Sequence, residues 1–185
     1  MTLSRQARNQ TMLRHVVHAA ILLGLAQLSN HVQASSLETC FDGPKLKMIQ
    51  PLDFGDLAMT KKMRGFVTVT AAFNQSLSPT LTAMRPPQPG ELSLCGTPQH
   101  EIDIVIAQAS LPMRGSSGPP LANTVKDFTI AGEGISLIRV SAGRWRGTIG
   151  DSGRATIRIG ATLDLVANGA YGHSYGEIDI EVVGR

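Results

Sequence analysis

Arg144, Trp145 and Arg146 are the consecutive residues whose types best suit the binding of a ligand. Neighbouring side chains of a strand point to opposite faces, so the indole would lie on one face and both guanidinium groups on the other. One interpretation is a core tryptophan beneath a solvated basic face. The other is ligand contact, with the indole as a platform for sugar or the arginines as an anion clamp. The chain has only one tryptophan, two tyrosines and five phenylalanines, which argues against a lectin.

The segment Gly150-Asp151-Ser152-Gly153 is similar to the segment that holds the nucleophilic serine of trypsin-like proteases. Such a serine needs a histidine base, a carboxylate that orients the base, and an oxyanion hole. Arg154 stands where the protease motif has another glycine, and the chain is too short for the double barrel that assembles the triad. Asp, Ser and Gly are ordinary turn residues. We therefore expect a hairpin turn here, with no catalytic residue, and a protein that is not an enzyme.

Tyr171, His173 and Tyr175 form a second cluster, in which the histidine could act as a base or as a pH sensor. Only Glu177 and Asp179 are near enough in the sequence to orient it. Glycine-flanked tyrosines at the start of a strand are more often packing residues, and packing is the role that we expect.

The carboxylates of Glu177, Asp179 and Glu181 alternate along the chain and could be read as a calcium site. Residues two apart on one strand are separated by about 6.6 Å, so their carboxylates do not converge on one ion. We expect instead a charged outer face that guards against association of sheets.

Cys40 and Cys95 are the only cysteines, and in an oxidising compartment the pair is expected to form a disulfide. A zinc site would need two more ligands at suitable spacing. Only His100 and His173 follow residue 34, and neither lies at ligand spacing from a cysteine. The sequence therefore predicts no metal and no cofactor.

The first 34 residues have the layout of a cleavable secretory signal. They contain no acidic residue, and three arginines precede an apolar run over residues 16–28. This run is shorter than the roughly 20 residues of a membrane span. Val32-Gln33-Ala34 offers small residues to a signal peptidase, so residues 1–34 are predicted to be removed. The mature domain, residues 35–185, would then lie in the periplasm, at the cell surface or outside the cell.

The mature domain is expected to be electrically neutral. The predicted signal holds three of the seventeen basic residues and none of the fourteen acidic ones, which leaves equal numbers in residues 35–185. Nucleic-acid binders normally show a basic patch or stripe. The two basic stretches here, residues 61–64 and 144–146, are short, so no nucleic acid is expected as a partner.

Apolar residues recur with a period of two along most of the mature domain, which is typical of strands with one buried face. The pattern is clearest over residues 155–165 and 178–183, which we predict to form an antiparallel hairpin. It recurs over residues 67–73 and 101–106. Weaker strands are predicted at 46–54, 125–130 and 135–140, and turn-rich segments at 85–90 and 112–120. About seven short strands and no amphipathic helix indicate two packed antiparallel sheets.

Three motifs of the mature domain are similar to a known family. They are Leu52-Asp53-Phe54-Gly55, Gly65-Phe66-Val67-Thr68-Val69, and residues 159–165 followed by 172–182. On these residues the chain resembles the bacterial secreted family called domain of unknown function 4402, a relative of spore coat protein U and of chaperone-usher pilin domains. The resemblance implies an all-β, immunoglobulin-like or pilin-like antiparallel β-sandwich after the signal peptide. It carries over no catalytic residue, and Cys40 and Cys95 look like the disulfide positions of pilin-type domains.

Two functions stay open. In the first, the chain is a non-catalytic, pilin-like component of the envelope or of a surface appendage that meets other such proteins through strand edges. In the second, it is a soluble periplasmic module that binds a small molecule or a glycan. Residues 35–39 precede Cys40 and hold one apolar side chain of useful size, Leu37. They are too short to serve as a donor strand, which favours an accessory or terminal component over a repeating shaft subunit.

Overall fold

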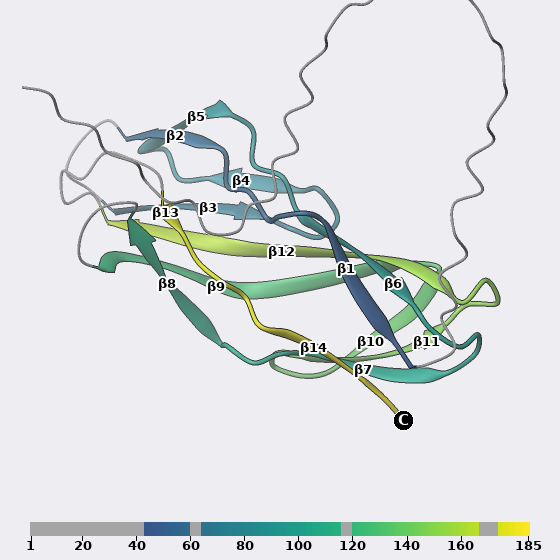
Figure 1. The fold of residues 1–185 in the computed structure, drawn as a ribbon. Coiled ribbons are helices and arrows are strands. Elements are labelled where there is room, and N and C mark those ends of the chain that lie inside the picture. The colour runs from purple at the N-terminus through teal and green to yellow at the C-terminus, as the bar shows by residue number, and fades with distance from the viewer. Residues whose placement is uncertain (1–42, 60–63, 116–119, 167–173) are drawn as a thin grey trace, which may run out of the picture. The chain divides into compact units, whose positions relative to one another are not determined.

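The computed structural model describes residues 43–59, 64–115, 120–166 and 174–185 (Figure 1). The side chains of residues 120–122 are also outside this description. The predicted signal over residues 1–34, Cys40, Tyr171 and His173 lie outside the described residues. The predictions made for them therefore stay predictions.

The described residues form strands and no helix, as the period-two pattern predicted. In chain order the strands are β1 (Lys45–Gln50), β2 (Asp56–Met59), β3 (Arg64–Val69), β4 (Gln75–Leu77), β5 (Leu81–Arg85), β6 (Gly90–Cys95), β7 (Glu101–Ile106), β8 (Ser110–Gly115), β9 (Pro120–Glu133), β10 (Ile135–Ser141), β11 (Arg144–Ile149), β12 (Arg154–Val166), β13 (Ser174–Tyr175) and β14 (Ile180–Gly184). Every pairing between them is antiparallel.

The long strand β12 is the centre of an eight-stranded sheet, called here the large sheet. One edge of β12 pairs first with β6 and then with β3, while its other edge pairs with β9. Beyond these neighbours, β1 pairs with β6, β4 with β3, and β8 and β13 continue the sheet past β9. Figure 1 shows β12 and β9 running side by side.

Four strands in the order β10-β11-β7-β14 form a second sheet, called here the four-stranded sheet. Strands β2 and β5 form a separate two-stranded sheet. Inward-facing side chains of the large and four-stranded sheets belong to one hydrophobic cluster. Its most deeply buried members include Leu94 and Ile157 of the large sheet and Ile102 and Ile104 of the four-stranded sheet. Burial of apolar surface between these sheets is the main source of stability.

The hairpin predicted from residues 155–165 and 178–183 was wrong, although both segments contain strands. Both edges of β12 are already taken, by β6 and β3 on one side and by β9 on the other. The last strand, β14, pairs with β7 in the four-stranded sheet instead. An alternating pattern specifies which face of a strand is buried, but not the strand beside it.

Several predicted boundaries also need correction. The strand expected over residues 67–73 ends at Val69, since Phe73 has a positive φ of 63° in the following turn. The strand expected over 46–54 ends at Gln50. The turn expected over 112–120 is partly strand, because β8 continues to Gly115 and β9 begins at Pro120. Strand β9 is therefore longer than the predicted 125–130.

Gly160 in β12 allows a close backbone approach within the large sheet. A Cβ built on it would lie 2.3 Å from the carbonyl oxygen of Val69 and 2.4 Å from the amide nitrogen of Ala71. No side chain fits at that distance from a backbone, so glycine is required where β3 ends against β12.

Within the described residues, no helix has the length and apolar character to cross a membrane.

Candidate functional site

Strand β11 places Trp145 on one face of its sheet and Arg144 and Arg146 on the other face, as predicted. Trp145 is 5% exposed and belongs to the core cluster, and it pairs with Ile104 of β7. Arg139 of β10 lies over the indole, 5.9 Å from the ring centroid. The ring is therefore a core side chain and not a surface platform, while Arg144 and Arg146 face outward.

Asp103 of β7 is the residue around which these arginines gather. Its carboxylate accepts hydrogen bonds from Arg144 Nη2 at 2.6 Å and from Arg146 Nε at 3.1 Å. Arg185 Nε, just after β14, donates a third at 2.9 Å. We call these four side chains the guanidinium cluster. The Asp103 side chain is only 4% exposed, although it lies on the outward face of the sheet, because the arginines cover it.

The three arginines keep Asp103 ionised. The hydrogen bond from Arg144 is the largest cause, and those from Arg146 and Arg185 add to it, so the pKa of Asp103 falls to about 2 from an ordinary 3.8. Burial of the carboxylate opposes this shift. Hydrogen bonds to the charged form lower a carboxyl pKa in this way.

The guanidinium cluster carries more positive than negative charge. Three arginines meet one carboxylate, and each of them bonds Asp103 through a single nitrogen. The Arg144 and Arg185 side chains are 44% exposed and that of Arg146 is 32% exposed. A guanidinium has five N–H donors in all. Donors therefore remain for an anion from outside the chain.

Apolar side chains flank this charge on the same outward face. In antiparallel sheets, directly paired residues share a face. Such pairs form a row across this sheet in the order Ile138, Arg146, Asp103 and Val183. This row crosses all four strands. Ile138 is 62% exposed and Val183 is 44% exposed, so the row is charged at its centre and apolar at both ends.

A different feature lies at the sheet margins, where β14 and β1 each pair on one side only within the described residues. Ile180 and Val182 pair with the buried Ile106 and Ile104 of β7, yet both remain partly exposed. In the same way, Met48 of β1 pairs with the buried Leu92 but is 63% exposed. The core is thus incompletely covered at both margins.

These two open margins approach each other at one end. Gly184 at the end of β14 lies against Pro44, the residue before β1, since a Cβ built on it would be 3.7 Å from Pro44 Cδ. The end of β14 and the start of β1 are therefore near each other.

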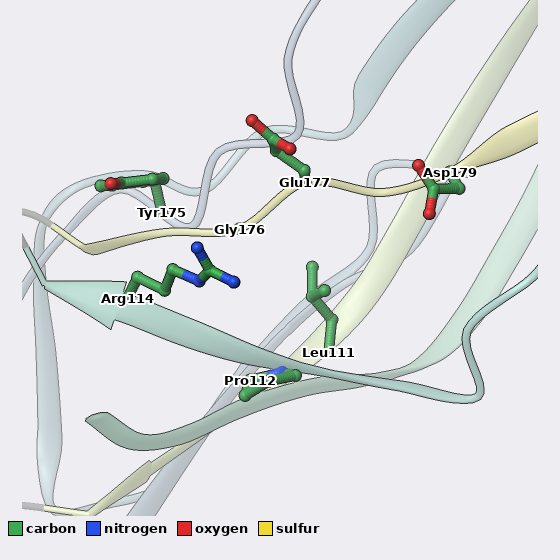
Figure 2. Close-up of a pocket in the computed structure, with 7 residues that line it drawn as sticks. All are labelled: Leu111, Pro112, Arg114, Tyr175, Gly176, Glu177 and Asp179. Atoms are coloured by element: carbon green, nitrogen blue, oxygen red, sulfur yellow. The ribbon is translucent and has the colours of Figure 1, made fainter. Parts of the chain in front are cut away.

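A groove between β8 and the segment before β14 is shown in Figure 2. It has a volume of about 190 Å³ and is lined by Leu111, Pro112, Arg114, Tyr175, Gly176, Glu177 and Asp179. In Figure 2, Arg114 lies along the groove beneath Gly176, and the Glu177 carboxylate points away. The Asp179 carboxylate accepts a hydrogen bond from Gln108. Pockets for small molecules usually measure about 300–1,000 Å³, so this groove is small for such a ligand.

Ser152 lies in a turn, as expected, but the turn does not close a hairpin. It links β11 of the four-stranded sheet to β12 of the large sheet. The Ser152 hydroxyl donates to the Arg154 carbonyl at 3.1 Å and accepts from the Arg154 amide at 3.2 Å. Gly153 has a positive φ of 67°, which suits glycine at this turn.

The carboxylate residues Glu177, Asp179 and Glu181 are exposed, as predicted. Ile178 and Ile180, which alternate with these carboxylates, pack against the core. No group of His, Cys, Asp and Glu suited to a metal occurs among the residues that the structure describes. Cys95 ends β6, while Cys40 lies outside the described residues, so the Cys40–Cys95 bridge stays a prediction.

Sequence reasoning missed Asp103 and Arg185 as partners of the two arginines. Asp103 alternates with Ile102 and Ile104, which did place it on the outward face. Its contact with residues more than forty positions away depends on the register of β7 against β11, which no local pattern specifies.

One comparison with known proteins gave a match. The family model described as domain of unknown function (DUF4402) matches residues 45–183. No curated protein and no solved structure matches the chain.

Proposed function

The chain belongs to the DUF4402 family, and from this premise we propose that it is a non-catalytic exported protein of the bacterial envelope or of a surface appendage. In this proposal residues 1–34 are removed on export, and Cys40 and Cys95 form a disulfide. The mature domain is a pilin-like β-sandwich in the periplasm or at the cell surface, where it binds partner proteins through an open strand edge.

The open edge of β14 is the observation that carries this proposal. A strand with unpaired backbone groups is a template for β-augmentation, in which an extended segment of another chain joins the sheet. The partly exposed Ile180 and Val182 would be covered by such a segment. The nearby margin at β1 offers Met48 for the same purpose.

The register of β14 indicates which backbone groups face the open side. Arg185 N donates to Glu101 O, and Asp179 O accepts from Ala107 N, so the odd-numbered residues bond β7. In an antiparallel ladder the intervening residues point the other way. The amides of Ile180, Val182 and Gly184 therefore face the open edge.

This assignment gives a sharp test of strand acceptance. A photo-reactive amino acid at Glu181, which is exposed on β14, should form a discrete adduct with an envelope protein in the native host. Val182→Pro removes one outward amide without removing a bond to β7, and it should abolish the adduct. Val182→Ala shortens the side chain but keeps the amide, so it should retain the adduct. Equal adduct formation by both variants, with the fold intact, would contradict the proposal.

A role as an accessory or terminal component fits the predicted mature N-terminus. Residues 35–39 span only about 17 Å when extended and offer one sizeable apolar side chain, Leu37. The domain would thus accept a strand without donating one from this end. The alternative, a periplasmic module that binds a small molecule or glycan, draws less support because the groove of Figure 2, at about 190 Å³, is small for such a ligand.

A further inference from the structure

We infer that the outward face of the four-stranded sheet is a second docking surface, and that its occupant is a protein segment with a carboxylate between aliphatic side chains. This surface is defined by Arg144, Arg146, Arg185, Ile138 and Val183 around the buried Asp103. It is the face of the sheet, and it is distinct from the open edge of β14.

Glu101 and Glu181 also lie on this face, so the excess of positive charge is local to the guanidinium cluster, and it is there that an acidic side chain is favoured. Asp103 engages one nitrogen of each of its three arginines, so further N–H donors are exposed beside it. Asp103 also holds the arginine side chains close together, which reduces the entropy that they lose when they bind a second carboxylate. Charge-assisted bonds from arginine to carboxylate are among the stronger hydrogen bonds in proteins.

The apolar ends of the row favour a protein over an acidic polysaccharide. Ile138 and Val183 are well exposed on either side of Arg146 and Asp103. The row crosses three inter-strand spacings, or about 14 Å, which an extended segment of five residues could cover, since its first, third and fifth side chains share one face. Sugars prefer aromatic platforms, and the only aromatic residue in the strands of this sheet, Trp145, faces the core.

Composition gives the same indication. Arginine is enriched at the centres of protein interfaces, where surrounding apolar contacts exclude water and strengthen its bonds. The outward face combines a central arginine group with exposed aliphatic side chains in a single register row.

Nuclear magnetic resonance titration of the labelled full-length protein tests the inference. The probe is acetyl-Val-Ser-Glu-Ser-Val-amide, and its neutral control is acetyl-Val-Ser-Gln-Ser-Val-amide. The glutamate peptide should shift the Nε–H signal of Arg146 and the methyl signals of Ile138 and Val183. Its affinity should exceed that of the glutamine peptide by about tenfold, as expected for one charge-assisted bond.

Variants separate charge from apolar contact. Arg146→Gln leaves Asp103 paired with Arg144 and Arg185, so the fold should persist while affinity for the glutamate peptide falls about tenfold. A double variant, Ile138→Ser with Val183→Ser, should weaken both peptides. The matched control is Arg154→Gln, which changes an exposed arginine on the large sheet and should leave affinity unchanged.

Three results would overturn the inference. These are equal affinities for the two peptides, shifts confined to other parts of the molecule, and no shift up to the solubility limit. A uronic-acid trisaccharide is titrated in the same way, as a test of a glycan occupant. If it binds the three arginines more tightly than the glutamate peptide, the occupant is an acidic glycan and the protein partner is rejected.

Discussion

At the scale of single residues, the Asp103 carboxylate links β7 to its neighbours on both sides. Arg144 and Arg146 approach it from β11, and Arg185 approaches it from the chain just after β14. A carboxylate enclosed in this way stays charged only because its partners are cations. One ionised carboxylate thus connects three neighbouring strands of one sheet.

The first prediction concerns acid stability. The folded pKa of Asp103 is about 2, below its ordinary 3.8. A depressed carboxyl pKa stabilises the fold above the unfolded value, and this contribution is lost as pH falls through the folded value. The free energy of unfolding should therefore decrease between pH 4 and pH 2. Urea titrations at several pH values should show a smaller decrease for Asp103→Asn, and an identical decrease would contradict the assignment.

A second prediction at this scale concerns Ser152. Its hydroxyl is used in a turn, so the protein should hydrolyse neither peptides nor esters. Ser152→Ala should cost about 1 kcal/mol of stability through the lost hydrogen bonds. Denaturant unfolding measures this cost. Hydrolytic activity that disappears in the folded variant would reverse the interpretation.

At the scale of elements, alternation predicted faces well and neighbours poorly. The buried faces of β7, β11 and β12 could be read directly from residues such as Ile104, Trp145 and Ile157. The pairing of β14 with β7 could not, because Val182 would satisfy the same pattern beside any apolar strand. For the same reason, the sequence placed only two of the four members of the guanidinium cluster together. Arg144 and Arg146 share one strand, whereas Asp103 and Arg185 reach them through pairing.

The third prediction tests the junction of β3 and β12. Gly160→Ala places a methyl group where the Val69 carbonyl and the Ala71 amide now lie. Since backbone must move to admit it, the change should cost at least about 2 kcal/mol. Chemical unfolding measures the loss. Gly43→Ala is an informative comparison, because Gly43 has a positive φ of 100° and a Cβ built on it meets no described atom within 4 Å, so its strain would come from the backbone conformation alone.

The fourth prediction follows from the open edge of β14. In the isolated protein the amides of Ile180, Val182 and Gly184 should exchange with solvent faster than those of Glu181 and Val183. The latter are expected to bond β7, and hydrogen-bonded amides exchange slowly. Residue-resolved hydrogen exchange would show this alternation. Uniform protection along β14 would mean that the edge is already covered.

At the scale of the whole molecule, the structure establishes an all-β architecture with a core shared by two sheets. The sequence predicted this class because strands with one buried face require a partner layer. It did not predict the number of strands or the size of the large sheet. Short strands such as β4 and β13 leave too few residues for a recognisable period.

The fifth prediction concerns export. Protein recovered from the envelope should begin at Ser35 and contain a peptide pair joining Cys40 to Cys95 after digestion without reductant. The bridge would close a long loop and stabilise the fold by about 4 kcal/mol in the chain-entropy model. Mass spectrometry tests both points at once. An intact N-terminus with two alkylatable thiols would contradict the proposed export.

The position of β12 in the chain has a consequence for the order of folding. β12 is the strand that joins β3, β6 and β9, yet it occupies residues 154–166 and is synthesised after all three. Until it emerges, these strands have no common neighbour and the large sheet cannot close. Such distant contacts slow folding. If the chain is exported as proposed above, a sheet that cannot close before β12 is made would leave the chain extended for translocation.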